Sequence, residues 1–364
     1  MSFIYRTGRW LVNENIRRIS FIVIFIIVAV AGGRLTHLYD VSKKPKVVVN
    51  QSIVEGDNAL NIGRYADAER IFWVEFKGNR KNKEAEWGVK IAQLRQSLLM
   101  PTFKTDLDVL YQEDPNDAYV NFFMGEYYAV NQQFEKAIAY YDRALALNSR
   151  LAEAHFKLAD LYEQQGLSGA TNVELLKAID IAPINKYRNK LGTLYFKQKR
   201  YEVAIKEYGK NQGYPLSALE SAMIYWRLDY LSQALNYQKQ ALELLGNVAL
   251  MSKPENQEPW YFEVAPKKII SLTEINQKMA YAYYGLSISF YLQGDTEKSE
   301  NAVQKIAKLS SAQQLALNLL LENDLNALAK ENKRFFDQVE AYKLRYLQSL
   351  SSDQKIEQQH SDAP

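Results

Sequence analysis

The chain lacks cysteine altogether and has only three histidines among its 364 residues. The absence of cysteine excludes disulfide bonds, a thiolate nucleophile and thiolate zinc ligands. The histidines, His37, His155 and His360, are too far apart in the sequence for metal-ligand spacing, and His155 is interpreted as a packing residue among apolar neighbours. The sequence therefore predicts no metal and no other cofactor.

The usual signs of enzyme chemistry are also missing. There is neither a glycine-rich phosphate-binding loop nor a nucleophile elbow. The 45 basic and 42 acidic side chains nearly balance, with a net charge of +3, and no block of like charges occurs. Charge spread in this way indicates exposed helix faces and favours neither nucleic acid nor an acidic substrate. We therefore expect a binding protein that is not an enzyme and has no nucleic-acid partner.

What the chain does have is a repeat of about 34 residues, the length of a helix-turn-helix unit in solenoid proteins. The pattern of small and apolar residues at 137–147 recurs about one period later, at residues 175–183. Such a unit cannot bury its apolar face alone, so neighbouring units stack and leave a long binding surface. The longer last interval predicts an insertion at 245–279. Small residues place the repeat starts near Val49, Glu84, Ala118, Ala152, Asn185, Pro215 and Ala280.

The repeats resemble the tetratricopeptide repeat (TPR) family over residues 49–309, most weakly in the repeat from Glu84. This resemblance implies an all-α, TPR-type solenoid of antiparallel helix pairs with a concave peptide-binding groove, as in scaffolds, chaperone adaptors and assembly factors. The matching residues in the three best repeats are Met124, Gly125, Tyr128, Ala137, Tyr141 and Ala144; Leu158, Ala159, Tyr162, Gly166, Leu175, Ala178 and Pro183; and Leu191, Gly192, Tyr195, Tyr201, Ala204 and Tyr208.

The resemblance also implies which residues line the groove, since these lie on the first helix of each repeat. The groove so defined is aromatic, with one acidic and one basic sector, and suits an extended segment or an amphipathic helix of a partner protein. The Lys and Asn pattern that holds a terminal carboxylate in chaperone-binding relatives is missing. A second interpretation is that the aromatic residues form the core between repeats. The predicted groove residues are Tyr119, Phe122, Glu126, Phe156, Asp160, Asn189, Phe196, Lys197, Met223, Trp226 and Arg227.

An apolar run at 19–31 follows an amino-terminal tail, residues 1–15, and precedes the repeats. Extended to 16–38, it is long enough for a transmembrane helix if its flanking arginines reach the interfaces. A removable signal peptide and a buried soluble helix are the alternatives. Arg17 and Arg18 directly precede the run, so the positive-inside rule favours a cytoplasmic amino terminus. We expect a single-pass protein of the inner (cytoplasmic) membrane of a bacterium, with periplasmic repeats.

The carboxyl-terminal part reads as one long helix, residues 310–350, followed by a polar tail, 351–364, that we expect to be disordered. Apolar residues recur along this helix in alternating steps of four and three, the spacing of a coiled-coil seam. The helix either caps the last repeat or pairs with a second copy or partner. The insertion is interpreted as a surface crossover or as a loop that docks on the groove. The seam residues are Leu321, Leu325, Leu328, Asn332, Phe335, Val339, Tyr342 and Tyr346.

Together these features predict a membrane-tethered scaffold that binds partner proteins and helps to assemble or stabilise a complex of the bacterial envelope. One alternative is a regulatory or glycan-binding subunit of a polysaccharide- or lipid-handling machine, because aromatic grooves also bind sugars. Another is an import receptor on an organelle, which would place the repeats in the cytosol.

The predicted orientation can be tested in cells that express the full chain. Because the arginines precede the apolar run, protease added to spheroplasts should digest the repeats. Full protection of the repeats, or recovery of a soluble product that starts near Gly32, would contradict the anchored arrangement.

Overall fold

The computed structural model describes residues 50–98, 100–211, 213–257, 259–265, 268–307 and 314–347. The chain divides into two units, Met1–Val54 and Glu55–Pro364, and the helical array belongs to the second. The predicted segments 1–15, 16–38 and 351–364 lie outside the described residues. No helix in the described part of the chain combines the length and the apolar character needed to cross a membrane.

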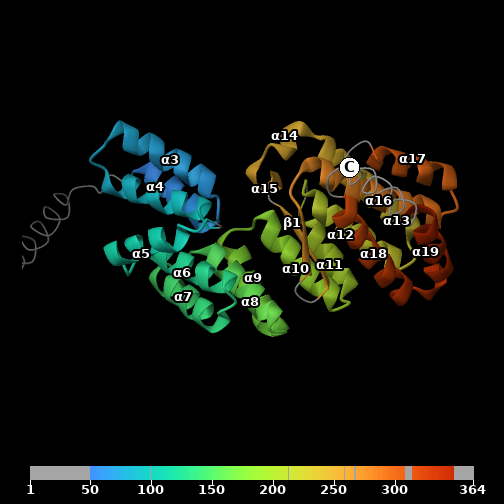
Figure 1. Ribbon diagram of the computed structural model, residues 1–364, viewed down its shortest axis with the longest axis horizontal. Coiled ribbons are helices and arrows are strands. Elements are labelled where there is room, and N and C mark those ends of the chain that lie inside the picture. Colours follow the sequence, from blue (N-terminus) through green and yellow to red (C-terminus); the bar gives the residue numbers. More distant parts are fainter. Residues whose placement is uncertain are drawn as a thin grey trace, which may run out of the picture. The chain divides into compact units, whose positions relative to one another are not determined.

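Successive helices form the array, most of them as antiparallel neighbours (Figure 1). The predicted starts near Glu84, Ala118, Ala152, Asn185 and Pro215 fall within a residue of helix starts in the structure. The helices are α2 (Gln51–Asn61), α3 (Tyr65–Gly78), α4 (Lys83–Gln96), α5 (Phe103–Glu113), α6 (Ala118–Val130), α7 (Phe134–Leu147), α8 (Ala152–Gln164), α9 (Ser168–Ile181), α10 (Asn185–Lys197), α11 (Tyr201–Gly209), α12 (Pro215–Arg227) and α13 (Leu231–Gly246).

The last part of the array contains the insertion and the carboxyl-terminal helices. In the insertion, β1 (Trp260–Ala265) pairs with β2 (Lys268–Leu272) in antiparallel register. Trp260 and Leu272, which face each other, are both buried. The all-α prediction therefore holds for the array but not for this hairpin. The elements are α14 (Val248–Met251), α15 (Pro254–Gln257), β1 (Trp260–Ala265), β2 (Lys268–Leu272), α16 (Ile275–Leu292), α17 (Thr296–Ala307), α18 (Gln314–Glu331), η1 (Lys333–Phe335), α19 (Phe336–Tyr342) and η2 (Lys343–Leu347).

Two of the helix pairs, α6–α7 and α10–α11, close where a glycine on one helix accepts a large ring from the other. A Cβ added at Gly125 of α6 would lie 2.6 Å from the Tyr141 ring of α7, and one added at Gly192 of α10 would lie 2.3 Å from the Tyr208 ring of α11. A substitution that enlarges either glycine must displace a buried ring. Ala137, Ala178 and Ala204 are fully buried, as expected for residues in close helix-helix contacts.

The turns between paired helices share one backbone feature. A residue with positive φ follows α6, α8, α10 and α12 at the same place: Gln132 (59°), Gly166 (73°), Lys199 (59°) and Asp229 (64°). This left-handed conformation ends the first helix of each pair and turns the chain back. Glycine adopts it without a steric penalty, whereas the other three side chains accept some strain.

The second repeat departs from this pattern. Here α4 packs closely on α3 and makes few contacts with α5. The ring of Phe72 on α3 lies against both Gly56 of α2 and Gly88 of α4, so the first three helices share one aromatic anchor. The repeat predicted from Glu84 is therefore not an ordinary hairpin.

The carboxyl-terminal segment is not one continuous helix, contrary to the prediction. Asn332 leaves the helical conformation, with φ −124°, and its Oδ1 accepts a hydrogen bond from the Arg334 backbone N–H at 3.2 Å. Asparagine makes such local bonds readily and so interrupts helices. The apolar seam residues on both sides of this break are buried in a core cluster shared with α12, α13 and α16. The segment thus folds back over the last repeats, which is the arrangement of a cap.

Ala137 and Ala139 provide a matched test of the close approach, because both lie on α7 but only Ala137 is buried. Ala137→Leu should lower the free energy of unfolding by about 1–3 kcal/mol, since the added methyl groups overpack the hairpin. Ala139→Leu should leave stability within about 0.5 kcal/mol of the parent. Thermal or urea unfolding measures both, and equal effects would show that the hairpin interface lies elsewhere.

Candidate partner-binding groove

The predicted groove residues lie on the first helix of each pair, and their charges form a ladder between successive first helices. Glu126 of α6 is buried between two cations: Arg95 Nε of α4 lies 3.2 Å from its Oε2, and Lys157 Nζ of α8 lies 2.9 Å from its Oε1. Burial alone lowers the pKa of Lys157, but Glu126 and Glu153 raise it above its usual value. The three helices are therefore joined by two ion pairs that share the buried Glu126 carboxylate, and removing either cation is costly.

The same pairing continues between α8 and α10. Lys190 Nζ lies 2.8 Å from Asp160 Oδ1 and 2.7 Å from Glu163 Oε2, and Lys197 Nζ lies 2.8 Å from Glu163 Oε1. Burial raises the pKa of Glu163, but the two lysines together hold it below its usual value. The predicted acidic sector on α8 and basic sector on α10 are thus one neutral network, not two separate charged surfaces.

Between α10 and α12 the contacts are polar hydrogen bonds. The buried Asn189 accepts a 2.6 Å bond from the Ser217 hydroxyl, and Glu220 accepts a 2.7 Å bond from Thr193. Burial raises the pKa of Glu220, partly offset by its hydrogen bonds. Asn189 therefore holds α10 to α12 and offers little surface to a partner.

At α6 and α8 the first-helix face is covered by the turn between α2 and α3. Tyr119 donates hydrogen bonds to the Asp57 carbonyl, at 3.3 Å, and to Asn61 Oδ1, at 3.1 Å. Asn148 donates to the same Asn61 oxygen at 2.9 Å, and a Cβ at Gly63 would lie 3.0 Å from the Glu153 carboxyl group. Nothing in the sequence indicates this contact, because an Asn and a Gly at a helix end are ordinary turn residues.

At α12 the same face is covered by α18. Arg227 Nε lies 3.1 Å from Glu331 Oε2, and its guanidinium stacks over the Phe196 ring with 4.7 Å to the centroid. Trp226 is only 4% exposed and donates a 2.8 Å hydrogen bond to Ser289. The chain's own helix thus occupies the part of the groove where Met223, Trp226 and Arg227 were predicted to meet a partner.

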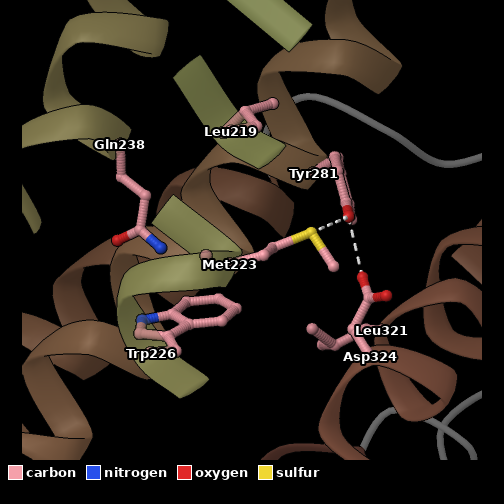
Figure 2. A pocket seen from close by; sticks show the side chains of 8 residues that line it. Leu219, Met223, Trp226, Gln238, Tyr281, Leu321 and Asp324 are labelled. Carbon is pink, nitrogen blue, oxygen red and sulfur yellow. Dashed lines mark hydrogen bonds between the residues drawn. The ribbon is translucent and has the colours of Figure 1, made fainter. Parts of the chain in front are cut away.

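Figure 2 shows the space left between α12, α13, α16 and α18. Tyr281 lies between the Met223 sulfur, at 3.6 Å, and Asp324 Oδ2, to which it donates a 2.7 Å hydrogen bond. The cavity has a volume of about 10 Å³, enough for about one water molecule. Burial raises the pKa of Asp324 to about 6, although Tyr281 and Arg227 act to lower it. This site is too small for a ligand.

Two predicted groove residues belong to the core instead. Phe122 is buried against Phe123 and Tyr141, and Trp226 is buried under α16 and α18, so neither ring reaches a partner while the helices stay packed. For these two the second interpretation, the core between repeats, is the correct one. Phe156 and Phe196 are half-buried, and Lys197 is 47% exposed.

What remains accessible within the described residues is a short stretch between α8 and α10. We call it the central groove, and it consists of Asp160, Glu163, Gln164, Lys190, Phe196 and Lys197. Its charges are paired with one another, and its one large apolar surface is Phe196. The sequence predicted three of these residues as groove positions but not that both neighbouring stretches are covered.

His155 is buried on α8, but its partner is a carboxylate and not only the apolar neighbours that the sequence indicated. Its Nδ1 lies 2.6 Å from Glu174 Oε2, and burial, which raises the pKa of Glu174, is outweighed by bonds from His155 and Lys177 that lower it. Among the residues whose positions are described, no group of three or more histidine and carboxylate side chains is arranged to hold a metal ion.

A family model described as "TPR repeat" matches residues 125–166, which cover the second part of α6, all of α7 and all of α8. This stretch of the chain is similar to a tetratricopeptide repeat. No curated protein matches the sequence.

The chain is similar to several solved structures. The apo form of RapI matches 85% of this chain and 99% of its own length, with 15% identity and a TM-score of 0.51. A Rap protein complexed with the competence and sporulation factor covers 83% of this chain and 97% of its own, with 15% identity and a TM-score of 0.47. YrrB, described as a TPR protein with an unusual peptide-binding site, covers 58% and 95%, with 18% identity and a TM-score of 0.37. The likeness to RapI and the succession of helix pairs described above identify the array as an all-α, TPR-like solenoid.

The raised pKa of Asp324 makes stability depend on pH. An unfolded aspartate titrates near 3.8 and Asp324 titrates near 6, so the folded state holds the extra proton between these values and stability falls as pH rises through them. Asp324→Asn removes this titration. The difference in unfolding free energy between variant and parent should change by up to about 3 kcal/mol from about pH 4 to about pH 7, in favour of the variant at the higher pH. Parallel pH profiles in urea unfolding would contradict this.

Proposed function

We propose that the chain is a non-catalytic scaffold that binds a segment of a partner protein in the central groove. TPR proteins generally mediate protein-protein interactions. The observation that carries the proposal is that the chain's own segments cover the first-helix face at α6 and at α12 and leave it accessible between α8 and α10. A partner that binds there is limited to a short contact.

The packing of α18 indicates what kind of segment this face accepts. Leu321, Leu325 and Leu328 of α18 recur at helical spacing and are buried in the cluster that includes α12 and α16. An amphipathic helix is therefore compatible with the first-helix surface of this array. We propose that the partner presents a helix or an extended segment with one apolar anchor for Phe196 and charges of both signs.

The alternative function, a glycan-binding or regulatory subunit of a polysaccharide- or lipid-handling machine, finds less support in the geometry. Sugars stack on free faces of aromatic rings, but Arg227 already lies over Phe196, and Lys186 Nζ lies over Phe156 with 5.5 Å to the centroid. These cations cover ring surface that a sugar would need for stacking. The half-buried Phe196 keeps some accessible surface, which an apolar side chain can contact without stacking on the ring. A protein segment that exchanges ion pairs fits this surface better than a neutral sugar.

We further propose that the protein is tethered to the inner membrane by residues 16–38, with periplasmic repeats, and acts in assembling or stabilising an envelope complex. The apolar run at 19–31 and the arginines before it support this part of the proposal. It is independent of the groove, and each part can fail without the other.

The absence of cysteine allows a clean crosslinking test in native membranes. A thiol-reactive photo-crosslinker attached to the Gln164→Cys variant lies in the central groove, and the substitution removes no ion pair. The same reagent attached to the Val109→Cys variant lies on the exposed surface of α5. We expect one discrete protein adduct at position 164 that is absent at position 109. Equal adducts at both positions, or none at 164, would refute a specific groove.

Phe196→Ala in the Gln164→Cys background should lower the adduct yield about tenfold or more while the melting temperature changes little, because aromatic anchors often dominate binding energy. Trp226→Ala is the matched control, since this buried ring should cost about 3–5 kcal/mol of stability. Thermal unfolding and adduct yield are measured for both. A parallel loss of stability and capture in Phe196→Ala would place that ring in the core.

A further inference from the structure

The outer face of α3 carries large apolar side chains that are exposed to solvent. Val74 is 67% exposed and Trp73 is 38% exposed, and the Trp73 ring lies 6.0 Å from the ring of the half-buried Phe76. The opposite face of the same helix buries Ala68 and Phe72. Helix α3 is therefore apolar on two sides, of which only one is needed for packing within the array.

Basic side chains surround this exposed apolar surface. Arg70, one turn before Val74, is 72% exposed. Lys77 Nζ lies 5.3 Å from the Trp73 ring centroid, and Arg80 Cζ lies 5.0 Å from the Phe76 ring centroid. Lys77 and Arg80 thus lie beside aromatic rings at the edge of this exposed surface. We call the surface the α3 patch: Arg70, Trp73, Val74, Phe76, Lys77 and Arg80.

The acidic residues of α3 are bonded to neighbours beside the patch. Asp67 accepts a 2.8 Å hydrogen bond from Arg64 Nε, Glu69 accepts a 2.9 Å bond from Gln93, and Glu75 accepts a 3.2 Å bond from Asn82. Glu69 and Glu75 are therefore directed toward α4 and its amino-terminal end. Asp67 also lies near the patch, with its Oδ1 3.7 Å from a guanidinium nitrogen of the exposed Arg70. The outward-facing surface combines apolar groups with positive charge.

We propose that the α3 patch docks on the surface of an anionic lipid bilayer. Tryptophan and aliphatic side chains enter the interfacial region, and lysine and arginine beside them are attracted to anionic headgroups. About 20 residues separate Ala31, the end of the apolar run, from Gln51, the start of α2. A chain of this length spans at most about 70 Å, so the apolar run and the α3 patch can engage the same membrane. The patch shares no residue with the central groove, and docking does not require that groove to bind a partner.

The test uses the full-length chain with one introduced cysteine. Val74→Cys carries an environment-sensitive fluorophore on the patch, and Val109→Cys carries it on α5, at a similarly exposed valine. The proteins are studied with vesicles of phosphatidylcholine alone and with vesicles that contain about one third phosphatidylglycerol. We expect a blue shift of the emission at position 74 with the anionic vesicles, and no shift at position 109 or with phosphatidylcholine alone.

Charge reversal and salt supply the second measurement. Arg70→Glu combined with Lys77→Glu should abolish the shift at position 74, because each basic residue near an anionic surface contributes about fivefold to binding, or roughly 30-fold for the pair. Salt at about 1 M should also reverse it, since the screening length falls to about 3 Å. A label at position 74 that stays in water with every vesicle would overturn the proposal and indicate a protein partner for the patch. A shift that is equal at positions 74 and 109 would overturn it as well, because it would report only general proximity to the bilayer.

Discussion

The close approach of paired helices is the constraint on which the rest of the structure depends. At Gly125 and Gly192 there is no side chain, and the rings of Tyr141 and Tyr208 fill the space that a Cβ would need. These contacts fix the rotation of each first helix about its axis, because the ring can enter only on the side of the glycine. Once the rotation is fixed, residues a turn apart on that helix face the next first helix. The ladder from Arg95 through Glu126 to Lys157 follows from this geometry.

The second repeat shows what happens where the constraint is met differently. Gly88 of α4 receives the ring of Phe72 from the preceding helix α3, which also lies against Gly56. Because the Phe72 ring already occupies the space beside Gly88, α5 does not place a ring there, and α4 and α5 make few contacts. The first three helices then form a local group whose α2–α3 turn lies on α6 and α8. The packing of Gly88 against Phe72 of the preceding helix thus accompanies the covering of the first-helix face at α6 and α8.

The sequence was sufficient to predict the helix pairs, because the apolar spacing and the small residues act within one repeat. It predicted the buried positions Ala137, Ala178 and Ala204 for the same reason. It did not predict the β-hairpin, the break at Asn332 or the two covered stretches of groove. Asn61 reaches Asn148 across 87 residues, and Arg227 reaches Glu331 across 104, and single-sequence periodicity carries no information on such contacts.

The groove prediction failed for Phe122 and Trp226 for a related reason. An aromatic residue on a first helix can point to the next helix or to the groove, and its sequence position is the same in both cases. Whether the ring faces the groove or the next helix depends on the size of the neighbouring side chains and on which surfaces later segments of the chain cover. Trp226 is buried because Ser289 accepts its N–H and α18 lies over it, neither of which the repeat pattern specifies.

If a partner binds in the central groove as proposed, the paired charges there predict that the response depends on how deeply each pair is buried. Separating Glu126 from Arg95 and Lys157 would leave a buried carboxylate uncompensated, so a partner gains nothing by entering there. The pair of Glu163 with the half-exposed Lys197 costs about 1 kcal/mol or less to exchange, because water already screens it. A partner carboxylate can therefore take Lys197 while Lys190 continues to compensate Glu163. Selectivity in this groove would then arise at its exposed edge, next to Phe196. The buried ion pairs of Glu126 would keep the helices in place while the exposed Lys197 changes its partner.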